Sequence, residues 1–207
     1  MNEGSSRPGG GKLMAQTLLA QILAALWSKD LSAGYRVWTV LDGARDKRVY
    51  SAVLATYTEN CCLYSGNLPP ALKFAAPYLV SLEPDDRTSQ YILKRAWGNS
   101  WGIFLRSSSD MGGLRRHLKK LLVVKDPKGR RLLFRYYDPR VLRLYLPTCW
   151  PAELATMFGP IKAFMAEGEE SGTLIQYRAE EGRLLEKVVT LEAAPQAKPA
   201  QGLERPL

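Results

Sequence analysis

The sequence contains few of the residues on which most enzyme active sites depend. It has one histidine, His117, and three cysteines, of which Cys61 and Cys62 are adjacent while Cys149 is remote in sequence. A catalytic triad would need His117 as its base, but nothing places a serine or cysteine beside this histidine. The same scarcity argues against a metal site with cysteine and histidine ligands. We expect His117 to be an exposed or half-buried residue of a basic helix, and the protein to be neither an enzyme nor dependent on a cofactor.

The sequence also lacks the patterns of nucleotide binding, membrane insertion and export. Neither G-x-G-x-x-G nor G-x-x-x-x-G-K-[ST] occurs, and Lys12 after Gly9–Gly11 has no strand before it. No apolar run reaches the length of a membrane span, and the N-terminus has no signal-peptide core. Without an export signal, three cysteines predict reduced thiols and no disulfide framework. We therefore expect a cytoplasmic protein with no membrane partner.

What is present predicts a folded chain with an α/β architecture. The 207 residues, 46% of them hydrophobic, can build one core and a small second lobe. The expected organisation is a disordered N-terminus (1–12), an α/β lobe (13–146), a smaller C-terminal α+β lobe (147–192) and a disordered tail (193–207). Predicted strands at 36–41, 60–65, 78–82 and 103–106 alternate with predicted helices at 13–31, 46–58, 68–76, 85–97 and 111–120. Such alternation predicts βαβ units and a mixed, largely parallel sheet flanked by helices. After Pro147, a short helix at 151–158 and strands at 161–165, 174–177 and 184–191 are expected.

The segment 123–146 carries the sharpest local signals. Lys125–Gly129 (KDPKG) predicts a hairpin turn, in which proline presets one φ and Gly129 supplies a positive φ. The strand that follows, 130–137, is expected to join the sheet as an antiparallel member. Asp138 suits the N-cap of a helix, and Pro139 suits its first turn.

The same region holds the excess charge of the chain. Between Gly113 and Tyr145 there are eleven Lys or Arg and two acids, a difference of +9 that equals the formal charge of the whole chain. A basic face this local indicates an acidic partner. A solvated surface of one helix and one hairpin, with no partner, would show the same pattern of charge. The candidate partner-binding residues are Arg115, Arg116, Lys119, Lys120, Arg130, Arg131, Arg135, Arg140 and Arg143.

The carboxylates of the chain offer an alternative function, a metal-dependent active site. Asp42 follows a predicted strand, where sites of α/β proteins tend to lie, and clustered acids could hold Mg²⁺ for phosphodiester cleavage. The acids that might join it are Asp46, Glu83, Asp85, Asp86 and Asp138. Each also has a local explanation at a strand end or a helix N-terminus, and the structural interpretation is favoured.

Several motifs together resemble one family. They are LDGARD (41–46), CCLYSG (61–66), LPPAL (68–72), YLVSLEPDD (78–86), WGNSWGIFLRSS (97–108), LRRHLKKLLVVKDPKGRRLLFRYYDPRVLRLYLPT (114–148) and FGPI (158–161). In this order they resemble, from about Val37 to Ile161, the domain-of-unknown-function family of effector adaptors, or chaperones, of bacterial type VI secretion. The block KDPKGRRLLFRYYDPRVLR is the most specific part of the resemblance.

The resemblance implies a protein that is not an enzyme. Such adaptors bind a toxic effector in the cytoplasm and help to load it onto the spike protein of the secretion tube, and effector choice is associated with the more variable C-terminal part. The family motif residues are expected to define the fold or to form an interface. They are Asp42, Gly43, Trp97, Gly98, Trp101, Gly102, Arg135, Tyr136, Asp138, Pro139 and Arg140.

Two rival functions remain at this stage. A nucleic-acid-binding protein would use the 113–145 face on phosphates, and a metal-dependent nuclease would add Asp42 and a second acid. The basic residues lack interleaved exposed aromatics or a groove-reading motif, so we expect no nucleic-acid partner. The expected partners are the cognate effector and the spike protein.

Overall fold

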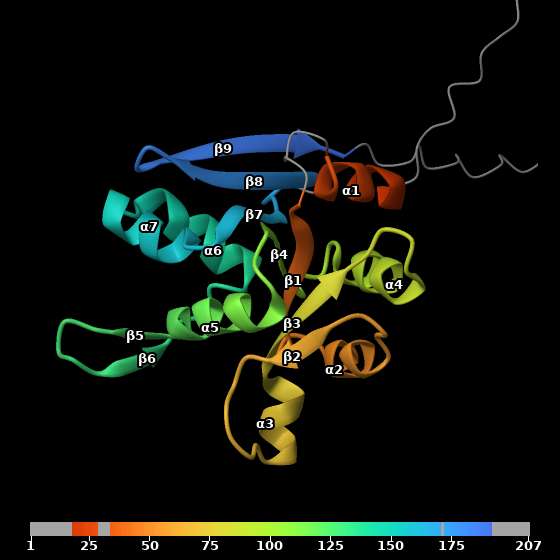
Figure 1. Cartoon of the computed structure of the whole chain (residues 1–207), viewed down its shortest axis with the longest axis horizontal. Coiled ribbons are helices and arrows are strands. Elements are labelled where there is room, and N and C mark those ends of the chain that lie inside the picture. The colour runs from red at the N-terminus through yellow and green to blue at the C-terminus, as the bar shows by residue number, and fades with distance from the viewer. Residues whose placement is uncertain (1–17, 29–33, 171, 192–207) are drawn as a thin grey trace, which may run out of the picture.

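One seven-stranded sheet organises the molecule. The computed structural model describes residues 18–28, 34–170 and 172–191 (Figure 1). The strands lie in the order β2-β3-β1-β4-β7-β8-β9. The termini predicted to be disordered, 1–12 and 193–207, lie entirely outside the described residues. The strands are β1 (Arg36–Asp42), β2 (Asn60–Cys62), β3 (Pro77–Leu82), β4 (Gly102–Ser107), β7 (Ile161–Glu167), β8 (Thr173–Glu180) and β9 (Arg183–Thr190).

Every neighbouring pair of strands in this sheet is antiparallel, so the prediction of a largely parallel sheet is wrong. The crossovers explain the error. β1 and β2 run in one direction with the opposite strand β3 between them, and β3 and β4 likewise flank β1. Each of these helical crossovers therefore joins strands of the same direction, as a βαβ pattern predicts, but leaves a gap that an antiparallel strand fills.

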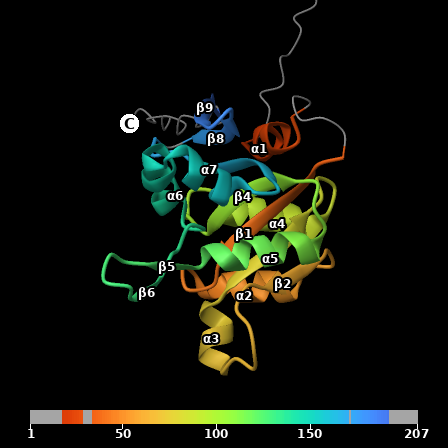
Figure 2. The same cartoon turned by 60° about the vertical axis from the view of Figure 1, so that its left-hand side comes forward.

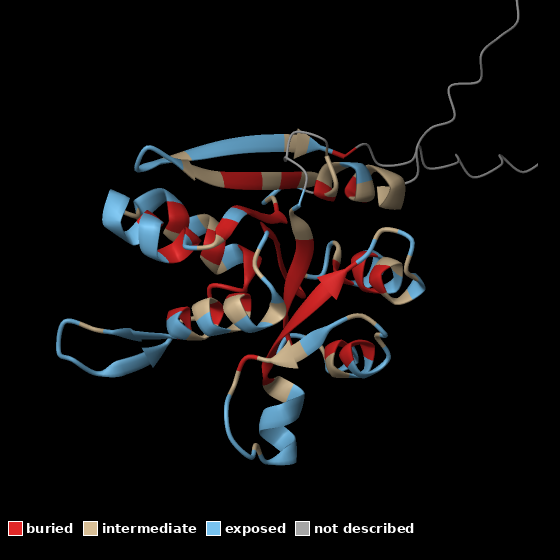
Figure 3. Ribbon diagram, in the orientation of Figure 1, coloured by how far each residue is buried: buried red, intermediate tan, exposed pale blue. Residues whose placement is uncertain are grey.

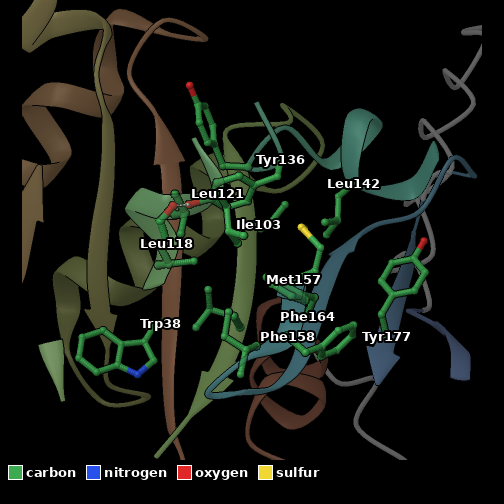
Figure 4. Packing of buried hydrophobic residues seen from close by; sticks show 14 of the residues in the cluster. Trp38, Ile103, Leu118, Leu121, Tyr136, Leu142, Met157, Phe158, Phe164 and Tyr177 are labelled. Atoms are coloured by element: carbon green, nitrogen blue, oxygen red, sulfur yellow. Dashed lines mark hydrogen bonds between the residues drawn. The ribbon is translucent and has the colours of Figure 1, made fainter. Parts of the chain in front are cut away.

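Helices cover both faces of the central strands. On one face lie α1 (Leu18–Leu26), α2 (Lys47–Leu54) and α4 (Arg87–Ala96), and on the other α5 (Met111–Leu121), α6 (Pro139–Tyr145) and α7 (Pro151–Phe158) (Figure 1). Trp38 and Val40 of β1 pack toward the second group, and Val37 and Leu41 toward the first. Strands buried on both faces are apolar throughout, which is also the composition of parallel strands. Figure 4 shows part of the hydrophobic core between the sheet and α5, α6 and α7, where helical side chains meet those of the strands.

The hairpin departs from its prediction. β5 (Val123–Lys125) and β6 (Arg131–Leu133) form a separate two-stranded sheet and are not a member of the main one. The predicted strand 130–137 therefore ends at Leu133. Gly129 has the positive φ expected of it, 77°. The hairpin projects from the body of the molecule in both views, and its residues are largely exposed (Figures 2 and 3).

The C-terminal elements form where they were predicted. The helix that ends at Phe158 is α7, and the three short strands are β7, β8 and β9. They continue the main sheet from β4, because Phe104 to Ser107 pair with β7. The two predicted lobes thus share one sheet.

Four helices begin at an aspartate N-cap, and the cap predicted at Asp138 is one of them. Asp46, Asp86, Asp110 and Asp138 are the N-caps of α2, α4, α5 and α6, and each carboxylate accepts a hydrogen bond from a main-chain N–H of the first turn. The remaining helices are α3 (Pro70–Ala75), which contains no buried residue, and a 3₁₀ turn, η1 (Leu146–Thr148).

Candidate protein-docking surface

Helix α5 presents the first part of the basic face. Leu114, Leu118 and Leu121 bury one side of the helix against the sheet, and this spacing leaves the lysines and arginines between them on its flanks. The Oδ1 atom of Asp110 accepts a hydrogen bond of 2.7 Å from the N–H of Gly113 and fixes the start of the helix. The basic residues of the last turn lie near the negative end of the helix dipole, where positive charge is favourable.

Six of the nine predicted partner-binding residues are held within the chain. Arg115 donates to the carbonyl oxygens of Cys62 and Tyr64, at 2.9 and 3.2 Å, and Lys119 donates to Ser65 Oγ. The guanidinium groups of four arginines bind an acceptor each: Arg130 with Asp126, Arg135 with Asp42, Arg140 with Asp138, and Arg143 with the carbonyl oxygen of Glu167. Their charges contribute to the local potential, but their geometry is set by the fold.

The side chains of three of the nine have no hydrogen bond or ion pair with the described part of the chain. These are Arg116 and Lys120, one turn apart on α5, and Arg131 on β6. Lys125 and Lys128 of the hairpin, which were not in the predicted set, are likewise exposed and unpaired among the described residues. These five side chains, called here the free cations, are the positive groups available to a partner in this region.

Asp42 and Arg135 join β1 to the segment after the hairpin. The Asp42 carboxylate is buried, accepts the N–H of Ala44 at 3.0 Å through Oδ1, and binds the Arg135 guanidinium through Oδ2. The Asp42 carboxylate raises the pKa of Arg135. The N–H of Asp42 also donates to the carbonyl oxygen of Trp101 at 2.7 Å. A buried acid that is paired in this way holds three segments of the chain together.

Gly43 and Gly102 are required by close backbone approach. A Cβ atom at Gly102 would lie 2.0 Å from the carbonyl oxygen of Val40, and one at Gly43 would lie 2.3 Å from that of Phe74. Val40 lies in β1 and Phe74 in α3, so a side chain at either position would displace the main chain of a packed element, and only glycine fits. These two family-motif residues therefore have a structural reason that does not depend on a partner.

The W-G-x-x-W-G motif is a turn built around one buried indole. Trp101 is fully buried, and its Nε1 donates to Asp46 Oδ2 at 3.3 Å. Trp97 ends α4 and is half-buried, and Gly98 after it has a φ of 75°. The turn thus buries the indole of Trp101 fully and that of Trp97 in part.

The YDP motif connects the hairpin to α6 through the core. Tyr136 is fully buried, and its hydroxyl donates to the carbonyl oxygen of Leu118 at 3.1 Å. Burial raises the pKa of this phenol well above its ordinary value. Asp138 and Pro139 start α6, and both are buried. Burial alone would raise the pKa of Asp138, but hydrogen bonds from the side chain and N–H of Arg140 outweigh it and lower that pKa.

His117 is half-buried, as predicted. Its Nε2 lies 2.9 Å from the carbonyl oxygen of Met157, and burial lowers its pKa. The ring thus ties α5 to α7. Its position supports a packing role.

The structure does not gather the acids considered for a metal site. In the described ranges, no three side chains of His, Cys, Asp or Glu lie close enough to hold a metal ion. Asp42 is paired with Arg135, Asp46 with Arg48, and Asp138 with Arg140. Asp86 caps α4.

An apolar groove opens beside the free cations and was not predicted. It has a volume of about 300 Å³ and lies between the end of α5, the hairpin and α7. Leu121, Phe134, Tyr145 and Met157 supply apolar lining, and Phe134 and Tyr145 meet edge to face with ring centroids 4.6 Å apart. Lys120 and Glu153 supply charged groups at its wall. The sequence offered no signal for this groove, because the hairpin that forms one of its walls was expected to join the main sheet.

One buried carboxyl group was also missed. Glu167, the last residue of β7, is buried, and its Oε1 has no hydrogen-bond partner among the described residues. Burial raises its pKa to about 7, although the N–H groups of Ser100 and Gly98 oppose the rise. A single glutamate two residues beyond a predicted strand gives no sequence signal of this kind.

Comparison with known protein families identifies a match over the central part of the chain. A family model described as a domain of unknown function (DUF4123) matches residues 37–156. No curated protein matches the chain, and no solved structure matches it either. Among the described helices, none is long and apolar enough to cross a membrane.

Proposed function

The chain belongs to the family described as a domain of unknown function (DUF4123), and from this premise we propose that it is an adaptor, or chaperone, for a type VI secretion effector. The family match covers most of the stretch in which the sequence resembles such adaptors. In this proposal the protein acts in the cytoplasm, binds the toxic effector there and helps to load it onto the spike protein. It performs no covalent chemistry itself.

The observation that carries the proposal is a projecting hairpin with exposed apolar side chains. The β5–β6 hairpin extends from the body and is largely exposed (Figure 3). It carries exposed valines and leucines and three of the five free cations, and the other two lie on α5. An exposed apolar patch with charged groups around it is typical of protein–protein interaction sites. Complementary charge would speed association and orient the partner.

Co-purification tests the proposal. The protein, tagged at one end, is co-expressed with the product of the toxin gene adjacent to its own gene and, separately, with the spike protein. We expect the toxin to be retained at physiological salt. If neither the toxin nor the spike protein is retained, the adaptor function is wrong.

The same preparation separates the rival functions. Binding of a labelled duplex DNA that falls steeply with salt would indicate phosphate contacts and argue for nucleic-acid recognition. Cleavage of that DNA in Mg²⁺, lost in Asp42→Asn while the fold is kept, would argue for a nuclease. We expect neither result.

A further inference from the structure

We infer that the groove between the β5–β6 hairpin and α7 binds an acidic, amphipathic segment of the effector. This inference rests on the proposed function and names the chemistry of the segment that is bound. Three observations carry it: the apolar lining of the groove, the uncovered hairpin that continues it, and the unpaired positive charges beside both.

The groove is built for apolar side chains. Its lining is dominated by Leu121, Phe134, Tyr145 and Met157 together with two valines of β5, Val123 and Val124. A volume of about 300 Å³ is at the lower end of the range for small-molecule pockets, about 300–1,000 Å³. One wall is the projecting hairpin itself, so the groove is partly open to solvent and continues onto an exposed strand pair, which suits a polypeptide better than an enclosed ligand.

The hairpin extends this apolar surface outward. Val124 lies directly opposite Leu132, so their side chains share one face of the hairpin, and Phe134 falls on that face two residues farther along. Val124 is 38% exposed and Leu132 is 47% exposed. A two-stranded hairpin is marginal by itself in water, so apolar side chains left open on it are best explained by a partner that covers them.

The charge beside the groove selects an acidic occupant. Lys120 stands at the wall, Arg116 lies one turn before it, and the hairpin adds Lys125, Lys128 and Arg131. The acids nearby are already engaged: Asp126 pairs with Arg130, and Glu153 accepts the N–H of Trp150 at 2.8 Å. Lys125 and Arg131 lie opposite each other on the hairpin, on the face away from Val124 and Leu132. Carboxylates on the occupant would therefore meet Lys120 and Arg116 first, while the cations of the hairpin add to the positive potential around the groove.

Other occupants fit less well. A second copy of this chain would bring two sets of the same free cations together, which is unfavourable. The terminal segments 1–17 and 192–207 are not acidic, since the first has one acid and two basic residues and the second has two of each. A segment of the effector can be acidic, as the charge beside the groove requires.

Site-specific photo-crosslinking tests the inference directly. A photoreactive amino acid replaces Leu132 in the full-length protein, and the complex with the toxin from the adjacent gene is irradiated and analysed by mass spectrometry. The same substitution at Leu72 of α3, which is 45% exposed, is the matched control. We expect position 132 to crosslink to one acidic, amphipathic segment of the toxin and position 72 to give no such product.

A substitution gives a second, independent measurement. Val124→Asp with Leu132→Asp should weaken toxin binding by more than about tenfold, because it removes apolar anchors and adds like charge toward an acidic partner. Leu72→Asp should leave the affinity unchanged. Both variants alter exposed side chains, and circular dichroism checks that they remain folded.

The outcomes separate this inference from the proposed function. If the toxin is retained but crosslinks only elsewhere, or crosslinks through a basic segment, the inference is wrong and the adaptor function stands. A crosslink from position 132 to the spike protein or to a second copy also overturns it. If the toxin is not retained by the unmodified protein, and the spike protein is not either, the proposed function itself has failed.

Discussion

At the scale of single residues, Asp42 and Arg135 are 93 positions apart in the chain, yet their side chains form one ion pair. The two groups differ in exposure: the Asp42 side chain is buried, whereas that of Arg135 is 41% exposed. Loss of the carboxylate would leave a guanidinium that water can still reach. Loss of the guanidinium would instead leave a buried negative charge, which is the more costly change.

We expect Asp42→Asn to destabilise the fold by about 1.5–3 kcal/mol, the contribution of a hydrogen bond to a charged group. Urea unfolding followed by circular dichroism measures the change. Asp85→Asn, at an exposed acid, is the control and should have little effect. If Asp42→Asn unfolds at the same urea concentration as the unmodified protein, the pair does not stabilise the fold.

Glu167 makes stability depend on pH. Its pKa in the folded protein is raised by burial to about 7, above the ordinary value of 4.5. A raised carboxyl pKa means that the folded state binds the proton more tightly than the unfolded state does. The stabilisation of the fold by this proton is therefore complete below pH 4.5 and is lost as pH rises through 7. The full shift corresponds to a free-energy change on the order of 3 kcal/mol.

Glu167→Gln should remove this dependence, because glutamine stays neutral. We expect the unfolding free energy of the unmodified protein to fall between pH 5 and pH 8 relative to that of the variant. Urea titrations at four pH values across this range measure the difference. Parallel pH profiles for the two proteins would contradict the assignment.

At the scale of helices and strands, local signals predicted well and long-range pairings did not. Asp138 and Pro139 marked the start of α6 because a cap and a first-turn proline act within one turn. The antiparallel sheet could not be read in the same way, because β3 enters between β1 and β2 from a later part of the chain. The hairpin turn was likewise predicted, but its separation from the main sheet depends on contacts that no local pattern encodes.

The cap of α6 is the element-scale test. Asp138 Oδ1 accepts the N–H of Arg140 at 3.0 Å, and the same carboxylate binds the Arg140 side chain. We expect Asp138→Ala to lower the unfolding free energy by about 0.5–2 kcal/mol. Asp138→Asn should retain most of the stabilisation by the cap, since asparagine also caps helices. Thermal unfolding measures both variants. An unchanged melting temperature for Asp138→Ala would mean that the cap contributes nothing.

At the scale of the whole molecule, the basic face separates into charges that the fold uses and charges that it leaves free. The sequence located this face but could not divide it, because the acceptors of Arg115 are carbonyl oxygens more than fifty residues earlier in the chain. Charge reversal of Arg115 or Lys119 would therefore disturb the fold as well as the surface. Arg116 and Lys120 test the surface alone.

We expect Arg116→Glu with Lys120→Glu to slow association with the toxin by about tenfold, because complementary charge acts mainly on the association rate. Arg87→Glu with Lys94→Glu changes the net charge equally on the exposed side of α4 and should have a much smaller effect. Raising the salt concentration from about 0.1 to 1 M shortens the Debye length from about 10 to 3 Å, so it should slow the unmodified protein more than the α5 variant. Stopped-flow binding at both salt concentrations measures these rates. If both double variants slow association equally, the partner responds to total charge, and the face on α5 has no special role.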